Sequence, residues 1–403
     1  MNIIKKAYCR TFQKVMHLAI PFMPYRKPRI IGSLKDVPGV LKKKNIQRVL
    51  IVTDKTVAKL GHVNRLAHAL YENDIVYAVY DQTTPNPTTT NVNEALDLYY
   101  MHQCEAIIGF GGGSSMDCAK AVGAMVARPH KPLGKMEGIL KVLCKLPLLI
   151  AIPTTAGTGS ETTVTMVITD ALTRHKYAAS DFPLIPRYAV LDPTVTVSLP
   201  PFVTATTGMD ALTHAVEAYI GRSTTITTRR DALHAVSLIF ENIDKVYTNG
   251  ENLKARRKML HASFYAGLAF SKSYVGYIHA VAHSLGGEYN IPHGLANALL
   301  LPIVLEEYGS TIYKKLHKLA VAASLCDESC SDEEAANIFI DAIRNMKKRF
   351  GIGDTFPEIK EEDIEKLSAY ADHEANPLYP VPVLMDRKEL EKFYYMTMEK
   401  KES

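Results

Sequence analysis

The strongest constraint on the fold is the alternation of two hydrophobic periods along the first half of the chain. Short apolar runs rich in β-branched residues indicate buried strands, and stretches with a three-to-four residue period indicate helices between them. We expect strands at residues 48–54, 75–80, 106–110 and 148–152, and helices near 56–72, 91–103 and 114–127. Strands that alternate with helices form βαβ units, so the pattern predicts a parallel sheet covered on both faces.

The pattern changes after Leu199-Pro200-Pro201, where strand signals become rare. Helical periodicity extends through residues near 201–221, 225–248, 252–270, 275–287 and 310–325. A chain of 403 residues is long enough for two domains. We therefore predict a basic amphipathic extension (1–30), an α/β domain (31–198) and an all-helical domain (199–403).

The N-terminal extension is basic and partly apolar. No acidic residue precedes Asp36, whereas the same stretch holds Lys5, Lys6, Arg10, Lys14, Arg26, Lys27, Arg29 and Lys35. Such a segment can lie on a membrane or a partner, act as a presequence, or pack on its own protein or a neighbouring subunit. We favour packing on protein. The apolar run 15–23 is interrupted by His17 and Pro21 and is far shorter than the roughly 20 residues of a membrane span.

Charge and cysteine content narrow the class of protein further. The net charge of +5 is small for this length, so nucleic acid is not an expected partner. The six cysteines are scattered without a paired framework. A large enzyme-like chain with unpatterned cysteines is typical of a reducing compartment, and we predict a cytoplasmic location.

Two segments that follow strands are candidates for a nucleotide site. Residues 109–117, Gly-Phe-Gly-Gly-Gly-Ser-Ser-Met-Asp, follow a strand and begin a helix. Glycines there let a phosphate approach the backbone amides of a helix N-terminus. The alternative is a tight turn, because Ser114 stands where the dinucleotide fingerprint has its last glycine. Residues 153–161 carry small hydroxyl side chains that suit a nucleotide site or an ordinary turn.

Asp54 ends the first strong strand. A carboxylate in this position can accept hydrogen bonds from both ribose hydroxyls and repels a 2′-phosphate, which favours NAD over NADP. The alternative is a plain helix cap. The cofactor-binding residues predicted from these segments are Asp54, Gly111, Gly112, Gly113, Ser114, Ser115, Asp117, Thr154, Thr155 and Thr158.

A group of polar residues in the apolar helices of the second half points to a metal. Asp210 and His214 are four residues apart, so they share one helix face, and His279 and His283 repeat that spacing. His293 follows at a Pro/Gly corner. Buried rings of this number are costly unless something organises them, although each alone could be a core histidine. Nitrogen and oxygen donors without thiolate fit Fe²⁺ or Zn²⁺ in an open catalytic site.

These motifs together resemble the iron-containing (group III) alcohol dehydrogenase family, and in particular its lactaldehyde reductase and butanol dehydrogenase types. The resemblance covers about residues 30–400. It rests on Val52-Thr53-Asp54-Lys55, Pro85-Asn86-Pro87, the 111–117 and 153–158 segments, the Asp210/His214 pair, and His279 through Pro292-His293-Gly294-Leu295-Ala296-Asn297. It implies an N-terminal dinucleotide-binding domain and a helical metal-binding domain.

The resemblance also implies roles for single residues. The metal ligands would be Asp210, His214, His279 and His293. His283 would lie near the nicotinamide without binding the metal, with Phe270 nearby, and Lys176 would contact the cofactor. Two segments depart from the family pattern: the basic segment before residue 30 is longer, and residues 376–385, Asn-Pro-Leu-Tyr-Pro-Val-Pro-Val-Leu-Met, differ from the corresponding family segment.

The expected activity is hydride transfer between NAD(H) and a small primary alcohol or aldehyde, or a diol or hydroxyaldehyde. The metal acts as a Lewis acid and His283 is a candidate proton relay. The alternatives are a lyase similar to dehydroquinate synthase, which also uses NAD and a metal, and a protein that binds NAD or metal without turnover. We expect a homodimer or a larger homo-oligomer, and we do not favour membrane contact by the N-terminal segment, although its composition permits it.

Overall fold

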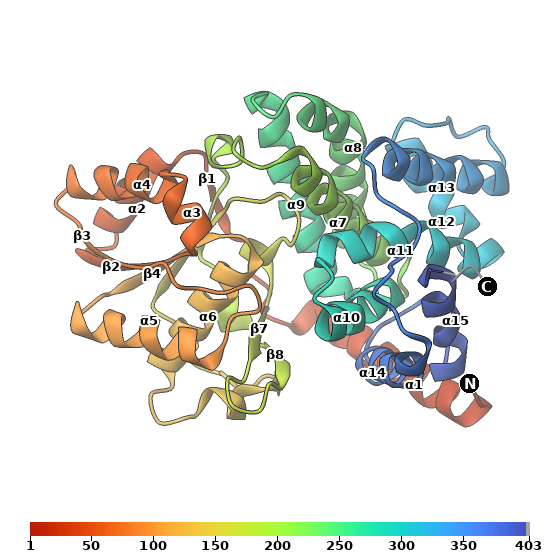
Figure 1. Cartoon of the computed structure of the whole chain (residues 1–403), viewed down its shortest axis with the longest axis horizontal. Helices are drawn as coiled ribbons and strands as arrows, with labels where there is room; N and C mark the ends of the chain where they lie inside the picture. Colours follow the sequence, from red (N-terminus) through yellow and green to blue (C-terminus); the bar gives the residue numbers. More distant parts are fainter. Residues whose placement is uncertain (400–403) are drawn as a thin grey trace. The chain divides into compact units, whose positions relative to one another are not determined.

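The computed structural model describes residues 1–399, which form two compact units (Figure 1). The α/β unit comprises Pro24–Leu199 and Glu251–Leu260. The helical unit comprises Met1–Met23, Pro200–Gly250 and the described residues from His261 onward. The N-terminal helix therefore belongs to the helical unit. The functional boundaries expected at residues 30 and 198 stay predictions.

The core of the α/β unit is a six-stranded sheet in which every pair is parallel, as the sequence predicts. Its order is β1 (Arg29–Ile31), β9 (Tyr188–Val190), β6 (Leu148–Pro153), β4 (Ala106–Gly111), β2 (Arg48–Val52) and β3 (Val76–Tyr80). A smaller sheet, which the sequence did not indicate, holds β5 (Gly138–Ile139), β8 (Lys176–Ser180) and β7 (Thr165–Thr169).

Both faces of the large sheet are buried, as expected for continuous apolar strands. Successive residues of β2 point to opposite sides. Val49 and Ile51 pack with α2 (Val37–Lys42) and α4 (His62–Tyr71). Leu50 and Val52 pack with α5 (Thr89–Met101) and α6 (Gly113–Ala127). This double burial explains why the strand carries no polar residue between positions 49 and 52.

One predicted helix is wrong in its extent. We expected a single helix over 56–72, but the structure has α3 (Lys55–Lys59) and then α4. Gly61, between them, has φ +77°, a left-handed conformation that a continuous helix does not contain. Helix α3 begins after its N-cap Asp54, directly beyond strand β2.

The strand order has a switch point at β2. The chain moves from β2 to β3 on one side, and then returns to place β4 on the other side of β2. Connections that leave neighbouring strands in opposite directions open a crevice at their carboxyl ends, where ligands bind in open α/β sheets. Asp54 follows β2, and Gly112 and Gly113 follow β4.

The helical unit is built around α7 (Pro201–Ile220), which is buried along most of its length. It packs on α8 (Ile226–Thr248) and α11 (His293–Tyr308), and α10 (Tyr277–Tyr289) packs on α11 and α14 (Ile364–Ala375). The unit also contains α1 (Ile3–Ala19), the end of α9 (Leu253–Ser273), α12 (Tyr313–Ala322), α13 (Asp332–Arg349) and α15 (Arg387–Thr397). The predicted helical half is thereby confirmed.

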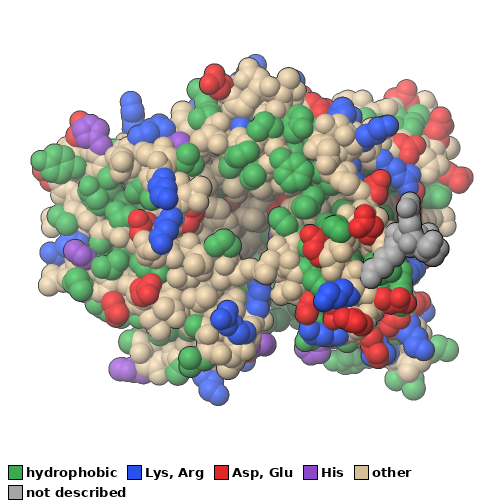
Figure 2. Space-filling model, viewed as in Figure 1, with side chains coloured by type: hydrophobic (Ala, Val, Ile, Leu, Met, Phe, Trp, Pro, Cys, Tyr) green, Lys and Arg blue, Asp and Glu red, His purple; other side chains and the backbone are tan. Residues whose placement is uncertain are grey.

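The surface shows both signs of charge. On the face drawn in Figure 2, Lys and Arg side chains are scattered among Asp and Glu side chains and do not gather in one basic patch. Within residues 1–399, no helix combines the length and the apolar character that a membrane crossing requires.

Candidate metal centre and nucleotide pocket

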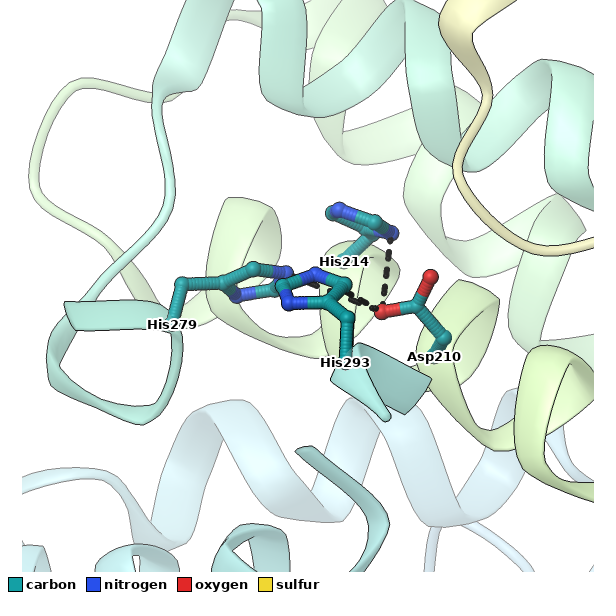
Figure 3. Close-up of side chains that lie close together, drawn as sticks. All are labelled: Asp210, His214, His279 and His293. Carbon is teal, nitrogen blue, oxygen red and sulfur yellow. Dashed lines mark ion pairs between the residues drawn. The ribbon is translucent and has the colours of Figure 1, made fainter. Parts of the chain in front are cut away.

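Asp210, His214, His279 and His293 point toward one another in the helical unit (Figure 3). One potential ligand atom from each lies within 4.8 Å of all the others. Asp210 Oδ1 is 3.4 Å from His293 Nε2, 3.9 Å from His279 Nε2 and 3.9 Å from His214 Nδ1. Two atoms bound at about 2.1 Å to one tetrahedral ion lie about 3.4 Å apart, so the cluster has the dimensions of a metal site.

Three helices bring these side chains together. Asp210 and His214 are one turn apart on α7, while His279 lies in the first turn of α10. His293 is the first residue of α11, which begins after Pro292. Gly294 permits the approach of α11 to α7, because a Cβ there would lie 2.6 Å from the carbonyl oxygen of Thr206.

The chemistry of the donors fits a divalent metal. Asp210 and His279 are almost fully buried, and His279 Nε2 has no hydrogen-bond partner. Burial, together with the neighbouring histidines, holds the pKa of His279 well below its usual value, so the ring is neutral and can donate a lone pair. A buried acceptor nitrogen without a donor is costly, and a metal ion would satisfy it.

Glu217, one turn beyond His214 on α7, holds the ring of His279 in place. Its carboxylate accepts hydrogen bonds of 2.9 Å from the backbone N–H groups of Gly276 and Ile278, and it lies 2.5 Å from His279 Nδ1. This contact leaves Nε2 of His279 for the metal, since a carboxylate partner fixes the tautomer of a ligating histidine. Glu217 was not predicted from the sequence, although it lies on the helix of the Asp210/His214 pair.

Two further side chains pack on the cluster. Phe270 stacks on His214, with ring centroids 4.1 Å apart and an interplanar angle of 14°. The amide nitrogen of Asn297 donates to Asp210 Oδ1 at 2.7 Å and lies 3.0 Å from His293 Nε2. Asn297 was noted in the sequence only as part of a motif.

His283 lies beside the cluster and outside it. Its ring stacks on His293 with centroids 5.0 Å apart, and its Nδ1 is 2.7 Å from Glu374 Oε1. Burial acts to raise the pKa of Glu374, but the attraction and hydrogen bond of His283, with a hydrogen bond from Tyr379, outweigh it and leave that pKa below its usual value. Sequence reasoning gave no sign of Glu374, which is 91 residues away along the chain.

A pocket of about 480 Å³ opens at the switch point of the α/β unit. Seven of the predicted cofactor-binding residues line it: Asp54, Gly112, Gly113, Ser114, Ser115, Thr154 and Thr155. Asp54 caps α3 through Oδ1, which accepts from two backbone N–H groups, and its Oδ2 accepts from Ser115 Oγ. Further lining residues that sequence analysis missed include Lys55, His62, Gln82, Val195 and Ser198.

Five predicted cofactor residues are not among those that line the pocket. Gly111 precedes the loop, and Thr158 lies against Gly113. Asp117 is turned inward, where it accepts hydrogen bonds from Ser160 Oγ and the backbone of Val167. Lys176 donates to Asn86 Oδ1 at 2.8 Å, and Phe270 belongs to the helical unit. Their roles toward a cofactor stay predictions.

The buried ammonium group of Lys120 holds the predicted 153–161 segment in place. Lys120 is fully buried on α6, and its Nζ donates to Ser160 Oγ at 3.0 Å, Thr163 Oγ1 at 2.7 Å and the carbonyl of Thr165 at 2.8 Å. Burial lowers the pKa of Lys120 to about 8 despite the nearby carboxylate of Asp117. Lys120 therefore ties α6 to the segment that follows the pocket-lining residues Thr154 and Thr155.

A switch-point pocket on a parallel sheet, together with a His/Asp cluster in a helical unit, defines a metal-dependent nucleotide-linked enzyme. The family comparisons are specific. Residues 29–193 match the model "Iron-containing alcohol dehydrogenase", and residues 204–398 match "Fe-containing alcohol dehydrogenase family, C-terminal". The chain belongs to the iron-containing alcohol dehydrogenase family. The predicted family and the predicted class of enzyme are confirmed, and the dehydrogenase assignment is favoured over the lyase alternative.

Individual relatives agree with this family. The chain is 36% identical to the NAD-dependent methanol dehydrogenase of Bacillus methanolicus over 84% of this chain and 90% of the relative. It is 38% identical to the 1,3-propanediol dehydrogenase of Klebsiella pneumoniae, covering 82% and 86%. The crystal structure of a 1,3-propanediol oxidoreductase superposes with a TM-score of 0.89 and 33% identity, covering 93% of this chain and 99% of the other.

Proposed function

We propose that this chain transfers hydride between NAD(H) and a small primary alcohol or aldehyde, with a divalent metal, Fe²⁺ or Zn²⁺, held by Asp210, His214, His279 and His293. The observation that carries the proposal is the convergence of these four donor groups within 4.8 Å. A metal in such a site polarises a carbonyl oxygen as a Lewis acid, and the nicotinamide supplies or accepts the hydride.

The residues of the chain supply orientation and proton transfer. Glu217 holds His279 with Nε2 toward the cluster, and Asn297 holds the Asp210 carboxylate. His283, beside His293, is the proposed proton relay, because it lies next to the cluster and is 41% exposed to solvent. The ring of Phe270 covers the ring of His214 on one side.

Asp54 and the glycines after β4 are the proposed nucleotide contacts. The helix that begins at Gly113 directs free backbone N–H groups toward the pocket, which suits a pyrophosphate. The Asp54 carboxylate would accept the ribose hydroxyls and repel a 2′-phosphate, so NAD(H) is the preferred cofactor. The NAD-dependent relative supports this choice.

Substrate class, location and assembly complete the proposal. Relatives named for methanol and 1,3-propanediol support a small alcohol or diol. The scattered cysteines, all of them free thiols, support a cytoplasmic location. A homo-oligomer is part of the same proposal, and light scattering would test it.

The deciding experiment follows NADH absorbance while metal-free protein is reconstituted with Fe²⁺ or Zn²⁺ and given a panel of small aldehydes, alcohols and diols. We expect turnover that requires both the metal and NAD(H). His279→Ala should lose metal and activity while the fold persists, whereas His130→Ala, an exposed histidine, should retain both. Full metal occupancy in His279→Ala would overturn the ligand assignment.

A further inference from the structure

The two segments that depart from the family pattern contact each other in the helical unit. Arg10 of α1 donates from Nη1 to the carbonyl of Val381 at 2.7 Å and from Nη2 to the carbonyl of Pro382 at 2.8 Å. Gln13, one turn further, is buried and donates from Nε2 to the carbonyl of Tyr379 at 2.7 Å. The N-terminal helix therefore binds the backbone of residues 376–385, called here the 376–385 loop.

The ends of this loop are fixed as well. The Tyr277 hydroxyl lies 3.0 Å from both Asn376 Oδ1 and the carbonyl of Met385, and it accepts from the Met385 backbone N–H at 2.9 Å. Hydrogen bonds from a charged guanidinium are stronger than neutral ones, and the partly buried Arg10 side chain makes two of them. The middle of the loop depends on α1, while its ends depend on Tyr277.

The loop carries one side chain that reaches the neighbourhood of the metal cluster. Tyr379 is buried, and its hydroxyl donates to Glu374 Oε1 at 2.7 Å. The same carboxylate oxygen lies 2.7 Å from His283 Nδ1. An unbroken series of contacts thus runs from Arg10 and Gln13 through the loop to Glu374 and His283.

These contacts determine which nitrogen of His283 is available. A neutral imidazole has one N–H, and a carboxylate acceptor at Nδ1 places the hydrogen there. Nε2 is then left as the acceptor nitrogen. We propose that Glu374 is a positioning residue for His283, and that α1 and the 376–385 loop hold Glu374 in place through Tyr379. The inference rests on the proposed relay function of His283.

A double-mutant cycle separates this coupling from simple packing of α1. Arg10→Ala and Glu374→Ala are made singly and together, with Lys14→Ala, an exposed lysine on the same helix, as the matched control. We expect Glu374→Ala to lower kcat by about 10- to 100-fold, the usual effect of losing such an orienting partner. Arg10→Ala should lower kcat less, should add nothing to Glu374→Ala, and Lys14→Ala should have no effect.

Two readouts other than turnover of the loaded enzyme accompany the cycle. Amide hydrogen exchange in metal-free protein should increase in residues 376–385 for Arg10→Ala and stay unchanged for Lys14→Ala. Metal content should be unchanged in all variants, because none of these residues belongs to the cluster. Added formate should restore part of the kcat of Glu374→Ala, since the missing group is a carboxylate that is 33% exposed.

The outcomes distinguish the possible failures. Additive effects of Arg10→Ala and Glu374→Ala, or a Glu374→Ala variant with parental kcat, would overturn this inference while leaving the dehydrogenase assignment intact. Metal loss in Glu374→Ala would also overturn it, because Glu374 would then act on the cluster. A parent protein that turns over no alcohol or aldehyde with NAD(H) would instead refute the proposed function.

Discussion

Removing the Glu217 carboxylate should weaken both the fold and the metal site. In Glu217→Ala, the backbone N–H groups of Gly276 and Ile278 lose their acceptor. A buried donor without a partner costs about 1–3 kcal/mol, so the two together should destabilise the protein by about 2–6 kcal/mol. In Glu217→Gln one carboxylate oxygen becomes an amide, one N–H is left unpaired, and the cost should be about 1–3 kcal/mol.

Metal affinity should fall in the same order. Without a carboxylate at Nδ1, His279 is free to rotate or to place its hydrogen on Nε2, and loss of such a partner weakens metal binding by about 10- to 100-fold. The stability assay is urea unfolding of metal-free protein, which keeps metal binding out of the comparison. The affinity assay is competition with a chelator.

A matched control is available on the neighbouring helix. Glu241 is exposed on α8 and has only an ion pair of 3.6 Å with Lys245, so Glu241→Ala should cost about 0.5 kcal/mol or less. If Glu217→Ala unfolded at the same urea concentration as Glu241→Ala and held its metal as tightly, the support assigned to Glu217 would be refuted.

Three further changes test other parts of the molecule. Asp54→Gly should lower the KM for NADP(H) about tenfold, because about 1.4 kcal/mol of repulsion with the 2′-phosphate is removed; a parent that already uses both cofactors equally would contradict this. His283→Ala should keep its metal while kcat falls by about 100-fold, and metal analysis that shows loss would make His283 a ligand. Lys120→Met should destabilise the protein by about 3–5 kcal/mol, because the partly buried Asp117 loses its cation and Ser160 and Thr163 lose a buried donor, whereas the exposed Lys135→Met should be neutral in thermal unfolding.

The parts predictable from sequence were those set by local periodicity. Residues 49–52 are apolar without interruption because both faces of the strand are covered. The spacing of Asp210 and His214 places both on one helix face whatever surrounds it. The left-handed Gly61 was missed because an isolated glycine in a helical pattern is tolerated and does not by itself mark the end of a helix.

Contacts between distant segments could not be predicted in this way. Glu374 meets His283 only because α14 packs on α10, and nothing near Glu374 in the sequence marks it. Lys120 resembles an ordinary lysine in a helix until the fold surrounds it with Ser160 and Thr163. The two departures from the family pattern were visible in the sequence, but their contact through Arg10 was not.

The two candidate sites belong to different units, which has a consequence for a molecule that loses its metal. The pocket is lined only by residues of the α/β unit, whereas the four residues of the metal cluster all belong to the helical unit. Each ligand therefore stabilises a different part of the chain by mass action. If the proposed nucleotide contacts are correct, a molecule that has lost its metal would keep the residues of that pocket and would continue to bind dinucleotide without turnover until the ion is restored.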